Sequence, residues 1–139
     1  MMKRSPLIAT VIVCLTIVYR IAFAADSPNF AGEYADKNFL KGQAVVQMSL
    51  EQTGKNVTIF FTGVQKDGNG AAPEINATGT VSGKGMVEFK FTDDMKNSGT
   101  GTIRKAGEDA IVTIKANRVA DSRSLKFYGE NMRLKKVKK

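Results

Sequence analysis

The sequence contains no histidine and no tryptophan, and its single cysteine, Cys14, lies in an apolar N-terminal run. The commonest side chain for acid–base catalysis, the thiol nucleophile and the soft metal ligands are therefore missing from the rest of the chain. One cysteine cannot form an internal disulfide, so packing alone must stabilise the fold. These absences predict a protein that is not an enzyme and that holds no cofactor or metal.

Acidic residues are the remaining candidates for catalysis. Two adjacent pairs, Asp93-Asp94 and Glu108-Asp109, have the composition of a carboxylate dyad, which can perform acid–base chemistry when burial separates the two pKa values. Both pairs fall in predicted turns, where we expect ordinary solvated carboxylates. The segment Asp67-Gly68-Asn69-Gly70 resembles the start of a calcium loop, but it lacks the downstream glutamate and the flanking helices. We interpret it as a flexible loop.

Residues 1–24 have the features of a cleaved secretory signal. Lys3 and Arg4 precede an apolar run over residues 7–18, and Ala22 and Ala24 supply the small residues before the cleavage site. This run falls short of the roughly 20 residues that span a bilayer, which argues against an uncleaved anchor. We predict export to the periplasm or beyond the cell, and a mature chain without a transmembrane segment.

The mature chain would contain 115 residues (139 minus 24), and its 18 basic residues exceed its 13 acidic residues by five. All of this excess lies at the C-terminus, in the basic residues of 133–139. We predict one domain over residues 25–132 and a basic tail, residues 133–139, that ends the last strand. The tail either contacts anionic lipid phosphates or protects that strand from pairing with another edge. Nucleic acid is not an expected partner, because no aromatic residues are interleaved with the charges.

Alternation of apolar and polar residues with a period of two is the main structural signal. It predicts eight strands, with one short helical turn near residues 36–41. Eight antiparallel strands joined by short turns form an up-and-down meander, and closure into a barrel removes its two exposed edges. We predict an all-β barrel, with a two-sheet sandwich as the alternative. The expected strands are residues 32–36, 43–52, 57–63, 75–81, 87–92, 99–104, 110–116 and a last strand containing Leu125 and Phe127.

The first strand opens with Gly32-Glu33-Tyr34, which resembles the opening of the calycin barrels, the lipocalin and avidin type. Those families begin with Gly-x-Trp, and the tryptophan closes the barrel floor, often under a basic side chain from the last strand. The resemblance implies that Tyr34 replaces the tryptophan after Gly32. It also implies that the first strand pairs with the last and that Arg133 stacks on the Tyr34 ring.

The inward face of the predicted barrel is apolar, but it includes many small residues. These leave space for an apolar or lipid-like small ligand, or else they let a narrow barrel fill itself with its own large side chains. The first interpretation makes the protein a ligand-binding barrel. Its candidate ligand-binding residues are Met48, Ile59, Phe61, Phe89, Phe91, Ile114 and Phe127.

The outer surface provides the alternative, a protein-interaction module or inhibitor of the cell envelope. The longest predicted loop, residues 65–74, is rich in glycine, and long loops on a rigid scaffold often carry recognition. Phe60 points outward from a threonine-rich strand, and Val45 and Ile111 are candidates to join it in a docking patch. The candidate partner-binding residues are Phe60, Lys66, Asp67 and Asn69.

Overall fold

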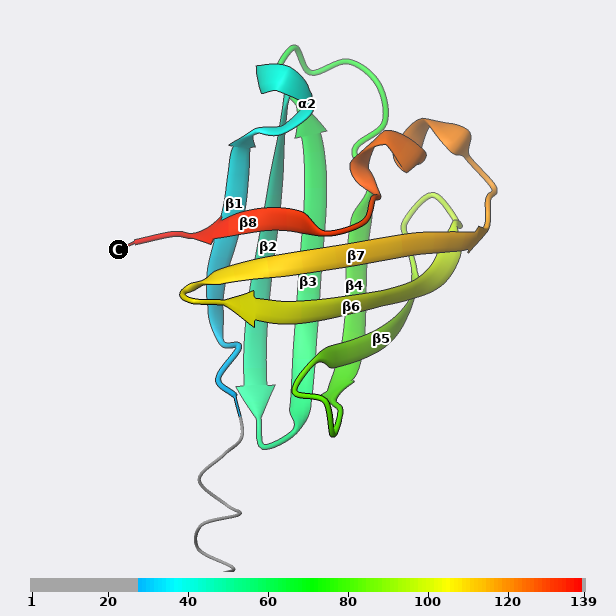
Figure 1. Ribbon diagram of the computed structural model, residues 1–139. Helices are drawn as coiled ribbons and strands as arrows, with labels where there is room; N and C mark the ends of the chain where they lie inside the picture. Colours follow the sequence, from blue (N-terminus) through cyan, green and yellow to red (C-terminus); the bar gives the residue numbers. More distant parts are fainter. Residues whose placement is uncertain (1–27, 139) are drawn as a thin grey trace, which may run out of the picture.

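The computed structural model describes residues 28–138, which form a closed antiparallel barrel of eight strands (Figure 1). Each strand pairs with its neighbours in sequence, and β1 also pairs with β8. The predicted up-and-down barrel is therefore confirmed, whereas the predicted signal, residues 1–24, lies outside the described residues. The strands are β1 (Gly32–Asn38), β2 (Ala44–Thr53), β3 (Asn56–Gln65), β4 (Glu74–Val81), β5 (Val87–Thr92), β6 (Ser98–Ala106), β7 (Asp109–Arg118) and β8 (Met132–Lys136).

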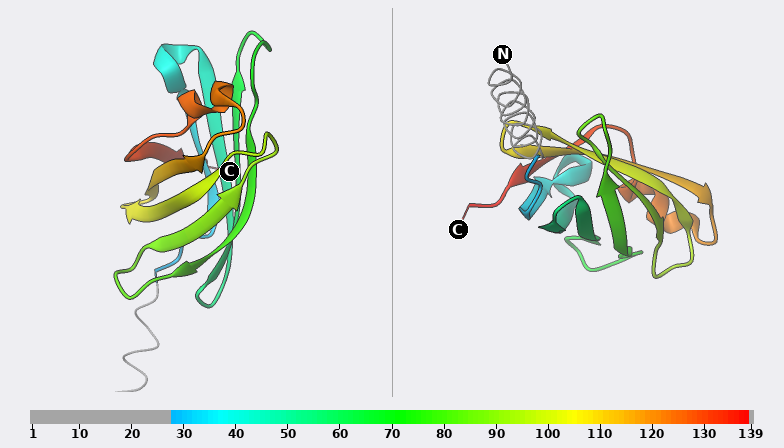
Figure 2. Two further views of the ribbon diagram at one scale, coloured as in Figure 1. Left: turned by 90° about the vertical axis from the view of Figure 1, so that its right-hand side faces the viewer. Right: turned by 90° about the horizontal axis from the view of Figure 1, so that it is seen from below.

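The barrel is flattened into two layers that cross at a steep angle (Figures 1 and 2). Strands β1 to β4 form one layer, and β5 to β8 run across it. The chain changes layer between β4 and β5, which pair over only three residues, from Gly79–Phe89 to Val81–Val87. Flattening brings the two inner faces close together, so large side chains from one layer reach the other.

The core follows directly from the period-two pattern. In β4 and β5, every second residue is buried and every intervening residue is exposed. The inward side chains of all eight strands join a single hydrophobic cluster. Because the strands close on themselves, this one cluster serves both layers.

The prediction of the last strand is wrong. Residues Ser122–Phe127 form the 3-10 helix η1, and the eighth strand, β8, comes five residues later. Asp121 accepts a hydrogen bond from the Arg123 backbone N–H at 3.0 Å and caps η1. The two buried residues of η1, Ser124 and Phe127, are three apart, which is the repeat of a 3-10 helix. Leu125 is 37 % exposed and points away from the core.

The short helical turn predicted near residues 36–41 is present as helix α2 (Phe39–Gly42), and it begins later because β1 extends to Asn38. Leu40 and Lys41 have φ of 52° and 57°, in the left-handed region that side-chain-bearing residues seldom adopt. Phe39 and Leu40 nevertheless pack against the core. Helix α2, η1 and the loop between β3 and β4 together cover one end of the barrel (Figure 1). The strained turn thus helps to close that end.

Candidate functional site

The seven residues predicted to bind a ligand all lie in the barrel core, and none is more than 6 % exposed. Four aromatic rings form a chain through the interior. Phe89 and Phe91 have ring centroids 6.4 Å apart, Phe91 and Tyr128 5.6 Å, and Tyr128 and Phe61 6.3 Å. These distances are those of direct aromatic contact. The side chains that would line a ligand cavity are therefore packed against one another.

Small residues on the inner face are covered by aromatic rings. A Cβ added at Gly63 would overlap the ring of Phe127, and a Cβ added at Gly101 would overlap the ring of Phe89. Phe127 also stacks on Phe39 of α2, with centroids 6.0 Å apart. At these glycines the structure supports the self-filling interpretation, because the space left by the missing side chain is occupied by a ring.

Tyr34 lies near the start of β1, toward the end of the barrel opposite α2, which we call the floor, and its basic partner is Lys105. The Lys105 Nζ lies 5.0 Å from the Tyr34 ring centroid and 3.1 Å from its hydroxyl oxygen. The Tyr34 hydroxyl donates to the carbonyl oxygen of Phe30 at 2.8 Å. Lys105 comes from the end of β6 and not from the last strand, and no local sequence signal marks it.

The prediction that Arg133 stacks on Tyr34 is wrong. Tyr34 pairs with Lys136 of β8, and Arg133 pairs with Ile111 of β7. The Arg133 guanidinium instead forms an ion pair with Asp109 at 3.1 Å. Asp109 also accepts the Lys136 backbone N–H, and this bond, with Arg133 beside it, lowers the pKa of the Asp109 carboxyl.

The prediction that Asp93 is a solvated turn residue is also wrong, because Asp93 is only 5 % exposed. Its Oδ1 accepts the backbone N–H groups of Met95 and Asn97, both at 2.9 Å. Its Oδ2 accepts the Asn97 side-chain amide at 3.0 Å and the Tyr128 hydroxyl at 2.6 Å. Four hydrogen bonds satisfy the buried carboxylate and leave it a structural role.

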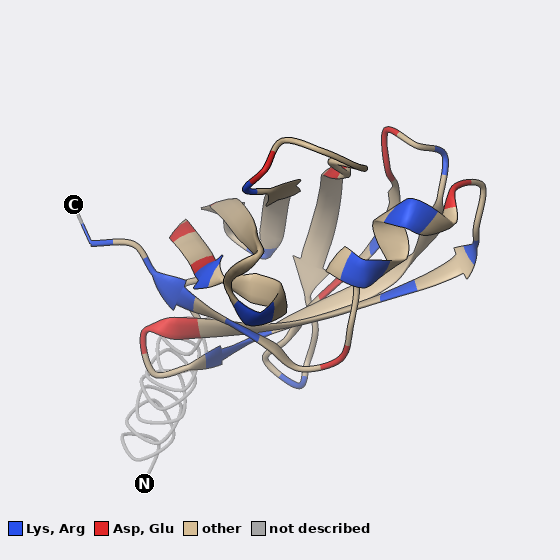
Figure 3. Cartoon of the chain, turned by 90° about the horizontal axis from the view of Figure 1, so that it is seen from above, with Lys and Arg blue, Asp and Glu red and all other residues tan. Residues whose placement is uncertain are grey.

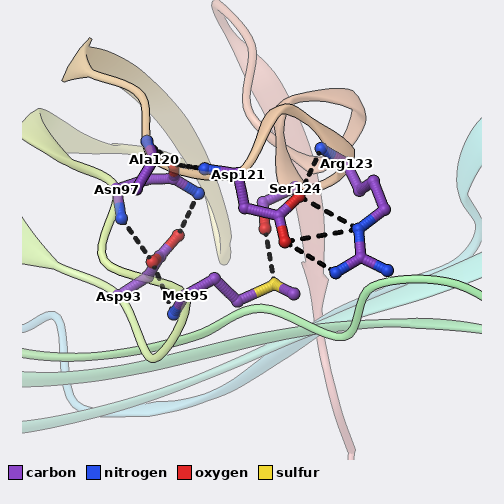
Figure 4. Close-up of polar contacts among 7 residues, drawn as sticks. All are labelled: Asp93, Met95, Asn97, Ala120, Asp121, Arg123 and Ser124. Atoms are coloured by element: carbon purple, nitrogen blue, oxygen red, sulfur yellow. Dashed lines mark hydrogen bonds and ion pairs between the residues drawn. The ribbon is translucent and has the colours of Figure 1, made fainter.

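Asn97 extends this network to the segment that precedes η1. Its buried side-chain oxygen accepts the backbone N–H groups of Ala120 and Asp121, both at 2.8 Å (Figure 4). Burial, followed by the hydrogen bond to Asp93, raises the pKa of the Tyr128 phenol. The network therefore joins the β5–β6 turn to both sides of η1 and holds Phe127 in place over the barrel.

The outer face of β1, β2 and β3 is hollowed by a depression of about 370 Å³, which we call the Phe60 groove. Phe60 is 43 % exposed and pairs with Ser49 of β2. Ala35 on β1 is only 8 % exposed, although it faces outward between Gln47 and Lys135. The small side chains of Ala35 and Ser49 lie beside the longer ones of Gln47 and Phe60, and this difference in length produces the hollow. The groove is lined by Glu33, Tyr34, Ala35, Lys37, Gln47, Met48, Ser49, Phe60, Thr62 and Val137.

The structure does not gather the predicted partner-binding residues into one site. Lys66, Asp67 and Asn69 lie in the loop beyond the end of β3, and Asp67 accepts the Asn69 backbone N–H at 2.9 Å. Lys66 is six residues from Phe60, or about 20 Å along an extended chain. The Phe60 groove and the loop are therefore separate surfaces.

Of the two residues suggested to flank Phe60, Val45 shares its outer face and Ile111 does not. Val45 pairs with Val64, which is 48 % exposed and faces outward four residues from Phe60 on β3. Ile111 is 7 % exposed and lies on β7 between Arg104 and Arg133. Of the groove residues, sequence reasoning named only Phe60 as a candidate for partner binding. The small outward residues Ala35 and Ser49 were among those missed, and their only signal is a small side chain on an outward face.

A second depression, of about 640 Å³, lies at the seam between β1 and β8, and we call it the basic groove. Five of its lining residues are basic, against one carboxylate, Asp36. Figure 3 shows the basic residues along β8 and the chain that follows it. Residues 133–136 thus belong to the barrel wall and are not a free tail.

Comparison of the chain with protein-family models, with curated proteins and with solved structures gives no significant match. Across residues 28–138, no group of three or more His, Cys, Asp or Glu side chains is placed to hold a metal ion. The helices of the same region are too short or too polar to cross a membrane.

Proposed function

We propose that the protein is an exported, non-enzymatic binding module that docks a protein partner through the Phe60 groove. The observation that carries this proposal is an aromatic side chain left 43 % exposed beside a groove of about 370 Å³. Aromatic residues that enter a partner's pocket are frequent anchors of protein interfaces. A rigid barrel wall holds the anchor in place, so little entropy is lost when a partner binds.

The alternative function, in which the barrel interior carries an apolar ligand, has less support. Its seven candidate residues are packed in the core, and rings of Phe89 and Phe127 occupy the space at Gly101 and Gly63. A ligand would have to displace these rings, which costs the contacts they make.

Catalysis by the acidic pairs also has little support. The Asp93 carboxylate accepts four hydrogen bonds within the fold. Asp109 is engaged by Arg133 and by the Lys136 backbone N–H. Neither carboxylate has the unoccupied hydrogen-bonding capacity at a cleft that a general base requires.

The proposal can be tested with two variants expressed in the organism that makes the protein. One carries a photo-crosslinking residue at position 60 and the other carries it at position 119. Val119 is the matched control, because it is 47 % exposed and lies beyond the end of β7. We expect a defined crosslinked partner from position 60 only. Its affinity for the purified protein should then fall at least tenfold in Phe60→Ser, since an aromatic anchor contributes roughly 2 kcal/mol. Val119→Ser should bind within twofold of the unsubstituted protein.

Equal affinities for the two serine variants would overturn the proposal. A lipid-sized adduct retained by the protein in native mass spectrometry would favour the interior carrier instead. The intact mass of the exported protein tests the compartment, because export by the predicted signal removes residues 1–24.

A further inference from the structure

The seam between β1 and β8 has the fewest paired residues of the eight strand junctions in the barrel. The two strands pair only at Tyr34–Lys136 and Ala35–Lys135, and the Val137 backbone N–H donates to the Glu33 carbonyl oxygen at 2.8 Å. Beyond Ala35, β1 continues to Asn38 without pairing to β8. The basic groove is lined by the unpaired end of β1, Asp36 to Asn38, and by residues of β8 and the chain that follows it.

The charge of the basic groove is largely uncompensated. Arg133 forms an ion pair with Asp109. Within residues 28–138, the other four basic lining residues form no ion pair with a carboxylate. Four unpaired cations around one groove repel one another, and an anionic ligand relieves this repulsion. These four residues are Lys37, Lys135, Lys136 and Lys138.

The basic groove adjoins the Phe60 groove, because Ala35, Lys37 and Val137 line both. A ligand that crosses this junction meets cations at one end and an exposed aromatic ring at the other. A polypeptide segment can carry an acidic side chain for the cations and an apolar side chain for the ring. A bilayer surface is flat, whereas these charges line a concave seam, so the shape favours a polypeptide over a membrane.

We propose that the basic groove binds an acidic, extended segment of the partner protein, next to the residue that docks at Phe60. This inference rests on the proposed function, and it specifies the chemistry of the partner. The acidic segment supplies charge complementarity, which speeds association and makes binding sensitive to salt.

The test uses the purified protein and two fluorescent peptides, one of eight glutamates and one in which a central glutamate is replaced by phenylalanine. The seam variant combines Lys135→Glu and Lys138→Glu. The matched control combines Lys55→Glu and Lys84→Glu, two exposed turn lysines outside both grooves. Both variants change the net charge by the same amount, so only position differs. Thermal melts check that each variant is folded.

We expect the seam variant to bind both peptides at least tenfold more weakly, and the control to bind within about twofold of the unsubstituted protein at the same salt. Phe60→Ser should weaken only the peptide that contains phenylalanine. Equal losses in the seam and control variants would overturn the inference, because binding would then follow net charge alone. Binding to phosphatidylglycerol vesicles but to neither peptide would also overturn it, in favour of a membrane. If Phe60→Ser weakens binding of the crosslinked partner and the seam variant does not, the inference fails while the proposed function stands.

Discussion

The ring of Phe89 packs directly on the backbone of Gly101, its cross-strand neighbour on β6. A Cβ at position 101 would overlap this ring. Phe89 is 6 % exposed, and its ring lies beside that of Phe91, so it has little room to move. Glycine at position 101 is therefore a packing requirement of the inner face.

Gly101→Ala should destabilise the protein by about 1–3 kcal/mol, the usual cost of overpacking a core. Gly83→Ala is the matched control, because a Cβ there meets no atom within 4 Å. We expect the control to change the free energy of unfolding by less than about 0.5 kcal/mol. Urea unfolding of both variants makes the comparison. Equal stability of the two variants would mean that the Phe89 ring moves freely and that the interior is looser than described.

Tyr34 and Lys105 should be energetically coupled across the barrel floor. Tyr34→Ala should cost about 3 kcal/mol or more, because it leaves a cavity, and Lys105→Met should cost about 0.5–2 kcal/mol through the lost ring contact. The double variant should cost less than the sum, since both changes remove the same interaction. Arg133→Met is the control, because Arg133 binds Asp109. Its effect should add to that of Tyr34→Ala, and coupling to Arg133 in place of Lys105 would contradict this floor geometry.

Tyr128 should make stability fall at high pH. Burial and the Asp93 carboxylate raise the pKa of its phenol in the folded state. Above pH about 10 the phenol ionises in the unfolded state but stays protonated in the folded state. The unfolded state then binds fewer protons, so the free energy of unfolding falls as pH rises. The slope should stay below the limit of about 1.4 kcal/mol per pH unit, because Tyr128 is only partly buried and solvent screens the effect.

The measurement is the free energy of unfolding at pH 8 and pH 11, for the unsubstituted protein and for Tyr128→Phe. The variant should be less stable at pH 8, by about 1 kcal/mol, because it loses the hydrogen bond to Asp93. Its stability should then decline less between the two pH values. Identical declines would show that the phenol is not protected in the fold.

Seven of the eight strands, the up-and-down barrel, predicted with a sandwich as the alternative, and the outward position of Phe60 could be predicted from the sequence. These depend on local alternation, which records which face of a strand meets the core. The pairing of the first strand with the last also followed, because a meander of eight strands leaves two edges that must be covered.

Other features could not be predicted because they depend on contacts between distant parts of the chain. Leu125 and Phe127 alternate as a strand would, but the segment forms a 3-10 helix. Asp121 caps this helix locally, and the buried Asn97 side chain, 24 residues away, accepts the Asp121 backbone N–H and anchors its start. The choice of Lys105 over Arg133 depends on the register of the last three strands, which no single strand encodes. The two grooves depend on small side chains meeting across neighbouring strands, and on β1 and β8 separating beyond Ala35. Such features arise from pairs of residues far apart in the chain, so only the folded barrel brings them together.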